Sequence, residues 1–427
     1  MQHEQDQQQQ EASGCPFQPA AVREGFQPYY SPELHASMAA ARGEAPVFWC
    51  EEIGYWVLTR YDDVLSVLQD GERFSAQNTT RPVTPMHPDA LKILQDGGYA
   101  STGSHSSLDG AVHKRIRQST SQVLNLREFV QLEPRVRALV RAALERLEGK
   151  DVVDLHAEFN YELPAQVIFM VLGIPEADIQ SVKRWAGMRS VIDFSPSSYE
   201  QQIEGARNLA AYWQYCTAMV HDRLAQPRDD FTSRILALRN GDDAVMTIPE
   251  AITHTFGVAF AGHETTTNQL SNTFRTLFTH RSEWDALCAD PALAANTVEE
   301  GLRYAGAVIG WRRIALQDVQ FKGIDIPKGA QIMLSLASAN RDEAMFPEPD
   351  RFDIRRKNSR KQLTMGNGVH FCLGAPLARL EMKIVFEEFP RFFPNAKLVE
   401  PDAAEHLKTF VFRAPHALPV SLKATTH

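Results

Sequence analysis

The chain has 427 residues, of which 44% are hydrophobic and 23% are charged, and its formal net charge is −9. These values are typical of a globular protein, and the absence of a basic domain argues against nucleic acid as a partner. No stretch reaches the roughly 20 consecutive apolar residues of a membrane-spanning helix, and the N-terminus does not resemble a signal peptide. We therefore expect a cytoplasmic protein with no membrane partner.

The five cysteines give no indication of a disulfide framework or a zinc site. Their number is odd, and they are far apart in the sequence with no pair at the spacing of a metal finger. They are Cys15, Cys50, Cys216, Cys288 and Cys372.

The N-terminal segment differs in composition from the rest of the chain. Residues 1–25 form a Gln-rich stretch whose first part has almost no apolar residues, which predicts a disordered tail. We expect residues 26–427 to form a single domain.

The first predicted elements are short. A short helix is expected within residues 28–42, with Ser31 as its N-cap. Apolar runs at 46–50 and 55–59 predict two strands of a hairpin, and residues 61–69 predict a second helix.

Residues 75–108 are rich in Ser, Thr, Pro and Gly and show little periodicity, which predicts a long loop. A loop of this length in a compact domain is usually functional or mobile, although a simple surface excursion is the alternative. His113 and Arg117 follow it, four residues apart, and share one face of a predicted helix. Taken alone, that pair is more typical of a solvated basic face.

Residues 129 to about 240 have helical periodicity, with breaks at Gly and Pro. The sequence shows no cluster of polar groups in this region, and it assigns no charged residue to a ligand pocket. The expected helices are 129–149, 164–172, 179–191, 199–224 and 231–238.

Thr247 and Glu250 form a predicted capping box that opens a helix of unusual length, over residues 247–280. Its middle contains Ala261–Thr265 and two further threonines, which weaken a helix. The two interpretations are a bend for packing and a functional distortion.

Two later segments carry charges with more than one interpretation. Glu300 and Arg303 lie three residues apart on one helical face, as surface ion pairs often do. Residues 355–361 hold five cations, which usually indicates a solvated face.

Cys372 lies in a loop with three glycines, directly before a predicted helix over 375–389. Glycine suits a tight loop, and the N–H groups of a helix N-terminus stabilise an anion. This position predicts a depressed pKa for the Cys372 thiol, hence a thiolate ligand or nucleophile. A small buried hydrophobic residue is the alternative.

The segment 365–374 resembles the haem-thiolate loop of cytochrome P450 monooxygenases, whose pattern is Phe-Gly-x-Gly-x-His-x-Cys-x-Gly. The one departure is Met365 in place of Phe. The segment Ala261–Thr265, the His113/Arg117 pair and the Glu300/Arg303 pair also match motifs of this family, in the same order along the chain. The matching positions in the loop are Gly366, Gly368, His370, Cys372 and Gly374.

The resemblance implies a mainly α fold with a small β region and a long central helix over haem b (iron protoporphyrin IX). Cys372 would be the axial thiolate ligand of the iron. Thr265 and Glu264 would be catalytic, Thr265 donating to the distal oxygen and Glu264 relaying protons, with Ala261 and Gly262 beside the cofactor.

The remaining site residues implied by the resemblance fall into three groups. His113, Arg117, His370 and either Arg313 or Arg312 would bind the haem propionates. Phe260, Ala261 and Ile309 would line the substrate pocket, roofed by residues 76–108. Glu300, Arg303 and Arg351 would form a buried structural triad.

The implied reaction is insertion of one oxygen atom from O2 into a small-to-medium apolar substrate, an aromatic ether being one example. Electrons would come from NAD(P)H through a ferredoxin or a flavodoxin-type donor with its reductase. The chain also resembles haem domains fused to phthalate-dioxygenase-type reductases. The expected docking residues are Arg355, Arg356, Lys357, Arg360 and Lys361. A peroxide-dependent hydroxylase of the same fold and a non-catalytic haem sensor are the alternatives.

Overall fold

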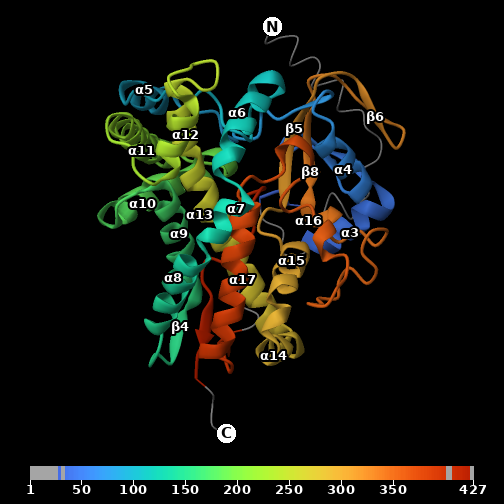
Figure 1. Ribbon diagram of the computed structural model, residues 1–427. Helices are drawn as coiled ribbons and strands as arrows, with labels where there is room; N and C mark the ends of the chain where they lie inside the picture. Colours follow the sequence, from blue (N-terminus) through green and yellow to red (C-terminus); the bar gives the residue numbers. More distant parts are fainter. Residues whose placement is uncertain (1–26, 30–33, 401–405, 424–427) are drawn as a thin grey trace.

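A computed structural model describes residues 27–29, 34–400 and 406–423 (Figure 1). The predicted tail and the Ser31 cap lie outside these residues, so they stay predictions. None of the described helices is long and apolar enough to cross a membrane.

The fold is mainly helical with a small β region, as expected (Figure 1). Among the described residues, the α-helices before the long central helix are α3 (Leu34–Glu44), α4 (Tyr61–Gln69), α5 (Pro88–Asp96), α6 (Gly110–Val123), α7 (Leu126–Gln131), α8 (Glu133–Glu145), α9 (Leu163–Leu172), α10 (Ile179–Phe194), α11 (Tyr199–Ala225) and α12 (Phe231–Arg239). The later ones are α13 (Ile248–Thr279), α14 (Arg281–Ala289), α15 (Ala294–Tyr304), α16 (Leu336–Ala339) and α17 (Ala375–Phe392).

The larger sheet has the strand order β1-β2-β8-β5-β3. The predicted hairpin is present, because Val47 pairs with Leu58 and Cys50 pairs with Tyr55. Strand β8 runs parallel to β2 and antiparallel to β5, which joins the N-terminal hairpin to the second half of the chain. The strands of this sheet are β1 (Val47–Cys50), β2 (Tyr55–Leu58), β3 (Phe74–Ser75), β5 (Gly310–Ala315) and β8 (Gln331–Ser335).

Two smaller sheets complete the β structure. One has the order β4-β10-β9 and the other is the pair β6-β7. Their strands are β4 (Val152–Asp154), β6 (Val319–Phe321), β7 (Ile324–Ile326), β9 (Lys397–Leu398) and β10 (Pro419–Ser421).

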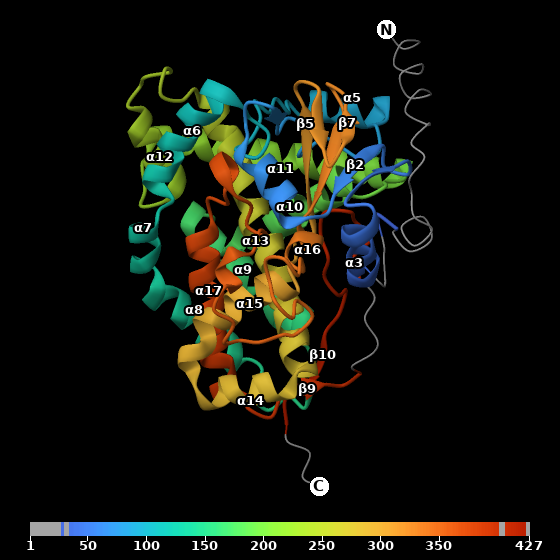
Figure 2. The ribbon, with the colours of Figure 1, turned by 90° about the vertical axis from the view of Figure 1, so that its right-hand side faces the viewer.

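Helix α13 is the axis of the helical part, and α9, α10, α11, α15 and α17 pack around it (Figures 1 and 2). It begins at the predicted capping box, in which Thr247 and Glu250 each bond the other's backbone N–H. Its 32 residues span about 48 Å at 1.5 Å per residue. The helix continues without a break through the threonine run, so the functional distortion considered for this segment is not seen.

Two predicted boundaries were wrong. The 75–108 loop contains a helix, α5, which begins after His87 and has Pro88 in its first turn. The predicted helix over 129–149 is replaced by α7 and α8, which meet at Leu132. Proline at the second position of α8 is compatible with a helix start, and that signal was missed.

Candidate functional site

The Cys372 loop is held in place by backbone geometry. Gly366 and Gly368 have φ angles of 72° and 67°, in the left-handed region that favours glycine. A Cβ atom on Gly368 would lie 2.4 Å from the carbonyl oxygen of Leu68, so only glycine fits against α4. The Cys372 N–H donates to the Met365 carbonyl at 2.9 Å, which closes the loop just before α17.

The predicted depression of the Cys372 pKa is wrong in this structure. Burial raises the pKa of the thiol above its ordinary value. The N–H groups of Gly374 and Ala375 and the charges of Arg117 and Arg379 act in the opposite direction, but do not overcome it. The helix N-terminus is therefore present as predicted, whereas the desolvation was not foreseen.

Cys372 faces an internal cavity of about 310 Å³. The opposite wall comes from the middle of α13, including Phe260, Ala261 and Thr265. The cavity thus lies between the Cys372 loop and the Ala261–Thr265 segment, which are about 100 residues apart in the sequence.

The wall of α13 depends on close packing behind it. A Cβ atom on Gly262 would lie 2.5 Å from Cγ1 of Ile168, so glycine allows α9 to approach. The Thr265 hydroxyl donates to the Ala261 carbonyl at 2.8 Å, one turn earlier in the same helix. Glu264 lies toward α10, because its Oε1 is 3.2 Å from the position that a Cβ atom on Gly187 would take.

Glu264 is set for proton exchange near neutral pH. Burial raises the pKa of its carboxyl to about 7, against the opposing charge of Lys183. The protonated and ionised forms of the carboxyl are therefore about equally populated at pH 7. A group with this property, one residue from Thr265, is suited to general acid–base work.

One end of the cavity is lined by Arg117, Arg313 and His370, and His113 packs against His370 with ring centroids 4.2 Å apart. Two buried nitrogen atoms there, Nε2 of His113 and Nη2 of Arg313, have no hydrogen-bond partner among the described residues, and the histidine nitrogen is a donor in the tautomer that carries its proton there. Arg117 donates to the Phe371 carbonyl at 2.7 Å. These unpaired donors suit an anionic ligand group.

Burial sets the charges at this end. It lowers the pKa of His370 to about 4, with Arg313 and His113 acting in the same direction, so His370 is neutral at pH 7. Burial also lowers the pKa of Arg313, to about 10, although nearby Asp109 acts in the opposite direction. Arg313 therefore still carries its charge at pH 7.

Arg312, the alternative to Arg313, has its donors turned elsewhere. Its guanidinium donates to the carbonyl oxygens of Thr79, Arg81 and Asp193. It does not line the cavity. Of the two arginines, Arg313 is the one that the structure places with His113, Arg117 and His370.

Ile309 is not where it was expected. It lines a separate small pocket with Tyr29 and Phe410, while its neighbour Val308 lines the large cavity. Successive residues of an extended segment point to opposite sides, so the error of one position moved the side chain to the wrong side. Of the 76–108 segment, Thr80 and the residues 104–106 line the cavity.

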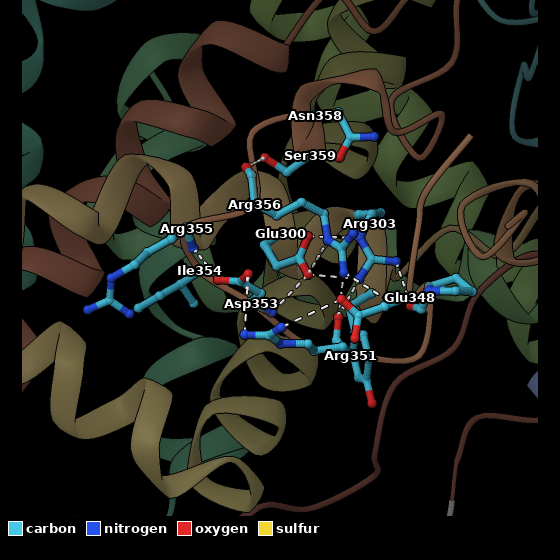
Figure 3. Close-up of polar contacts among 12 residues, drawn as sticks. Glu300, Arg303, Glu348, Arg351, Asp353, Ile354, Arg355, Arg356, Asn358 and Ser359 are labelled. Atoms are coloured by element: carbon cyan, nitrogen blue, oxygen red, sulfur yellow. Dashed lines mark hydrogen bonds and ion pairs between the residues drawn. The ribbon is translucent and has the colours of Figure 1, made fainter. Parts of the chain in front are cut away.

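The buried triad contains Arg356, not Arg351 (Figure 3). The Glu300 and Arg303 side chains are fully buried and joined by bonds of 2.7 and 2.8 Å. Arg356 Nε donates to Glu300 Oε1 at 3.2 Å. Arg351 offers only its backbone carbonyl to Arg303, and its side chain is 60% exposed.

Arg356 was also predicted as a docking residue for the electron donor, and this prediction is wrong, because its side chain is only 9% exposed and is bound to Glu300. The other four cations of this segment are exposed. They are Arg355, Lys357, Arg360 and Lys361.

Two charged residues of the cavity wall were not predicted from the sequence. Arg189 on α10 and Glu381 on α17 both line the cavity. Arg189 precedes Asp193 by four residues, a spacing that signals a helical ion pair. Glu381 falls on the same helical face as Leu377 and Ile384, and a carboxyl on an apolar face was the available signal.

Comparison with known proteins identifies related sequences and structures. The family model for Cytochrome P450 matches residues 283–412. Erythromycin C-12 hydroxylase of Saccharopolyspora erythraea is 33% identical over 390 residues, covering 90% of this chain and 93% of that protein.

Two solved structures are similar over nearly the whole chain. The structure of cytochrome P450 CREJ in complex with (4-ethylphenyl) dihydrogen phosphate has a TM-score of 0.90 and 37% identity, covering 93% of this chain and 99% of that one. An intact type IV self-sufficient cytochrome P450 monooxygenase has a TM-score of 0.92 and 33% identity, covering 96% of this chain and 54% of that one.

Proposed function

Because this chain belongs to the cytochrome P450 family and is a haem-dependent monooxygenase, we propose that it oxygenates a small-to-medium, mainly apolar aromatic substrate. One atom of O2 enters the substrate, and NAD(P)H supplies two electrons through a redox partner. The observation that carries the proposal is the cavity between Cys372 and the Ala261–Thr265 segment.

The cavity wall fits the haem of this family. Cys372 would supply the thiolate that holds the haem iron, and the unpaired nitrogen atoms of His113 and Arg313, with Arg117 and His370 beside them, would suit the two propionates. Ala261 and Gly262 line the same cavity and would lie beside the bound cofactor. When bound, the haem supplies the activation of O2, which amino-acid side chains cannot perform.

Thr265 and Glu264 are the proposed proton donors. The Thr265 hydroxyl lies in the cavity wall and can donate a hydrogen bond there if it leaves the Ala261 carbonyl. Glu264 is positioned on the side of α13 that faces α10, from which it can pass a proton toward Thr265.

Aromatic side chains support an aromatic substrate. Phe194, Phe260, Trp311 and Phe412 all line the cavity. Phe194 packs against Phe412 with centroids 5.0 Å apart, so the rings form one continuous surface. CREJ was solved with an aryl phosphate, which agrees with an aromatic or aryl ether substrate here.

The exposed cations Arg355, Lys357, Arg360 and Lys361 are the proposed docking surface for an acidic electron donor. The chain as a whole is acidic, so a local positive patch can orient such a partner. A ferredoxin or flavodoxin-type protein with an NAD(P)H reductase is the proposed donor, in the cytoplasm. A reductase joined to the same polypeptide is the second arrangement, since the type IV relative is self-sufficient.

Two alternative functions make different demands on the site. A haem sensor needs no acid–hydroxyl pair, and a peroxide-dependent enzyme needs no electron donor. The Glu264/Thr265 pair favours the O2-dependent reaction over both.

The first experiment is the absorption spectrum of the reduced protein under carbon monoxide. The proposed function predicts a strongly red-shifted Soret band that Cys372→Ser abolishes, whereas Cys288→Ser, which changes a cysteine away from the cavity, leaves it intact. A band typical of imidazole ligation in the native protein would refute Cys372 as the ligand. Product formed with NAD(P)H and a donor, but not with peroxide alone, then separates the monooxygenase from the peroxide-dependent enzyme.

A further inference from the structure

Arg189 places a positive charge in the wall of the proposed substrate cavity. It lies on α10, and its side chain is 11% exposed. The guanidinium lies over two rings of α13, 5.1 Å from the centroid of Phe260 and 5.4 Å from that of Phe256. The charge is thus held against the aromatic surface described above.

The guanidinium is only partly satisfied by protein groups. Its Nε and Nη2 atoms both donate to a single carboxylate oxygen, Oδ2 of Asp193, at 3.2 and 3.0 Å. Within the described ranges, no hydrogen bond is made by Nη1. One donor edge of a cavity-lining arginine is therefore left for a ligand.

The ion pair does not cancel the positive charge of this region. Asp193 also lies close to Arg312, which donates to the Asp193 backbone carbonyl at 3.2 Å. Two positively charged arginines therefore lie near one carboxylate, and only Arg189 is hydrogen-bonded to it. Tyr99, which also interacts with Arg189, adds no negative charge at neutral pH, because burial raises the pKa of its hydroxyl.

The other charged residues of the cavity wall, among the described residues, lie elsewhere. Arg117 and Arg313 belong to the end assigned to the propionates, and Glu381 lies on α17. Arg189 contacts Phe260, which is five residues before Thr265 on α13, a separation of about 7.5 Å along the axis. One aromatic ring with a para substituent has a comparable length.

We propose that the substrate carries an anionic group, a carboxylate or a phosphate monoester, that binds Nη1 of Arg189 and directs the opposite end of its aromatic body toward Thr265 and Cys372. This inference rests on the proposed function and deepens it by naming the substrate class. A planar guanidinium with a free edge matches two oxygens of either anion. The rival interpretation is that Arg189 and Asp193 only stabilise the last turn of α10.

The test is equilibrium binding to the haem-loaded protein, followed by calorimetry and by the substrate-induced shift of the Soret band. The probes are 4-propylbenzoate, its neutral counterpart 4-propylbenzamide, and 4-propylphenyl phosphate with 4-propylanisole as its neutral counterpart. The native protein should bind at least one anion about tenfold or more tightly than its neutral counterpart. The pair of probes that shows this preference identifies the anion as a carboxylate or a phosphate.

Arg189→Gln should remove that preference. It should weaken binding of the anion about ten- to a hundredfold and binding of the neutral probe less than about threefold. Arg184→Gln is the matched control, because Arg184 is an exposed residue of the same helix. Arg189→Lys keeps the charge without the fork and should give an intermediate preference. Asp193→Asn should strengthen anion binding, since it removes the competing carboxylate.

Equal binding of anions and neutral probes by the native protein would overturn the inference, as would an equal loss of both in Arg189→Gln. The native protein alone provides this test if a variant fails to fold. Failure of the proposed function gives a different result, because the thiolate-type band under carbon monoxide would then be missing from the native protein. A normal band without an anion preference refutes only the role of Arg189.

Discussion

The hydroxyl of Thr265 donates to the carbonyl oxygen of Ala261 at 2.8 Å, within an unbroken α13. The threonine hydroxyl is therefore held by a bond that any new acceptor of its proton must replace. Because the same carbonyl is one turn away, the exchange needs only a rotation of the side chain.

Thr265→Ala should leave the thiolate-type spectrum and substrate binding intact while lowering product formation on the order of tenfold or more. The reason is that alanine cannot donate the proton that the hydroxyl supplies. Thr265→Ser keeps the hydroxyl and should restore most of the product. The measurement is product formed per NAD(P)H consumed, and unchanged coupling in Thr265→Ala would contradict the assigned role.

Glu264 should produce a pH-dependent step in the reaction. Burial raises the pKa of its carboxyl to about 7, so the protonated fraction falls from most of the molecules at pH 6 to few of them at pH 8. The rate of proton delivery should decline over that interval in the native enzyme. Glu264→Gln should be slower and should lose this step, which a rate profile between pH 6 and pH 8.5 measures. A profile of the same shape in both proteins would assign the step to another group.

The Glu300–Arg356 contact gives a direct comparison of two nearby arginines. Arg356→Gln removes a partner from a fully buried carboxylate and should lower the free energy of unfolding by about 2–4 kcal/mol. Arg351→Gln changes an exposed side chain and should cost about 1 kcal/mol or less. Denaturant unfolding followed by circular dichroism measures both. Equal effects would mean that the Arg351 side chain shares the structural role.

These two arginines also show where sequence reasoning reached its limit. The Glu300/Arg303 spacing and the glycine pattern around Cys372 are local, and the structure has the ion pair and the loop where they were expected. Choosing between Arg351 and Arg356 required the path of an irregular segment, which no periodicity describes. The charged residue with the exposed side chain was chosen, because spacing says nothing about which guanidinium turns inward.

The residues of the cavity wall divide in the same way, into those that a local motif reveals and those that depend on tertiary contacts. Thr265 and Phe260 were found from a motif within one helix, whereas Arg189 came from a helix taken as purely structural. Its role depends on α10 crossing α13, a tertiary contact between segments about 70 residues apart. Ile309 was misplaced by a single position, since the strand register decides the side on which a residue lies.

Glu381 supplies a prediction on stability. Its side chain is 2% exposed, Oε1 has no partner in the described part of the chain, and burial raises the pKa of the carboxyl to about 8. In the unfolded chain the value is near 4.5, so the folded state holds this proton more tightly. The group's contribution to stability is therefore complete below about pH 4.5 and declines as the pH rises to about 8, by at most about 5 kcal/mol.

Glu381→Gln is uncharged at every pH and should escape this decline. The difference in unfolding free energy between the variant and the native protein should therefore shift in favour of the variant from pH 5 to pH 8.

Glu387→Gln, on the same helix, is the matched control, because the pKa of Glu387 is shifted in the opposite direction. Burial opposes the charge of Glu387, but Lys383 and Arg137 hold the pKa of its carboxyl below the ordinary value. Its ion pairs stabilise the fold above about pH 4.5, so Glu387→Gln should be less stable than the native protein at pH 8. A difference for Glu381→Gln that is the same at pH 5 and pH 8 would mean that Glu381 is charged in the folded protein and has a partner, such as a water molecule or a cation in the cavity.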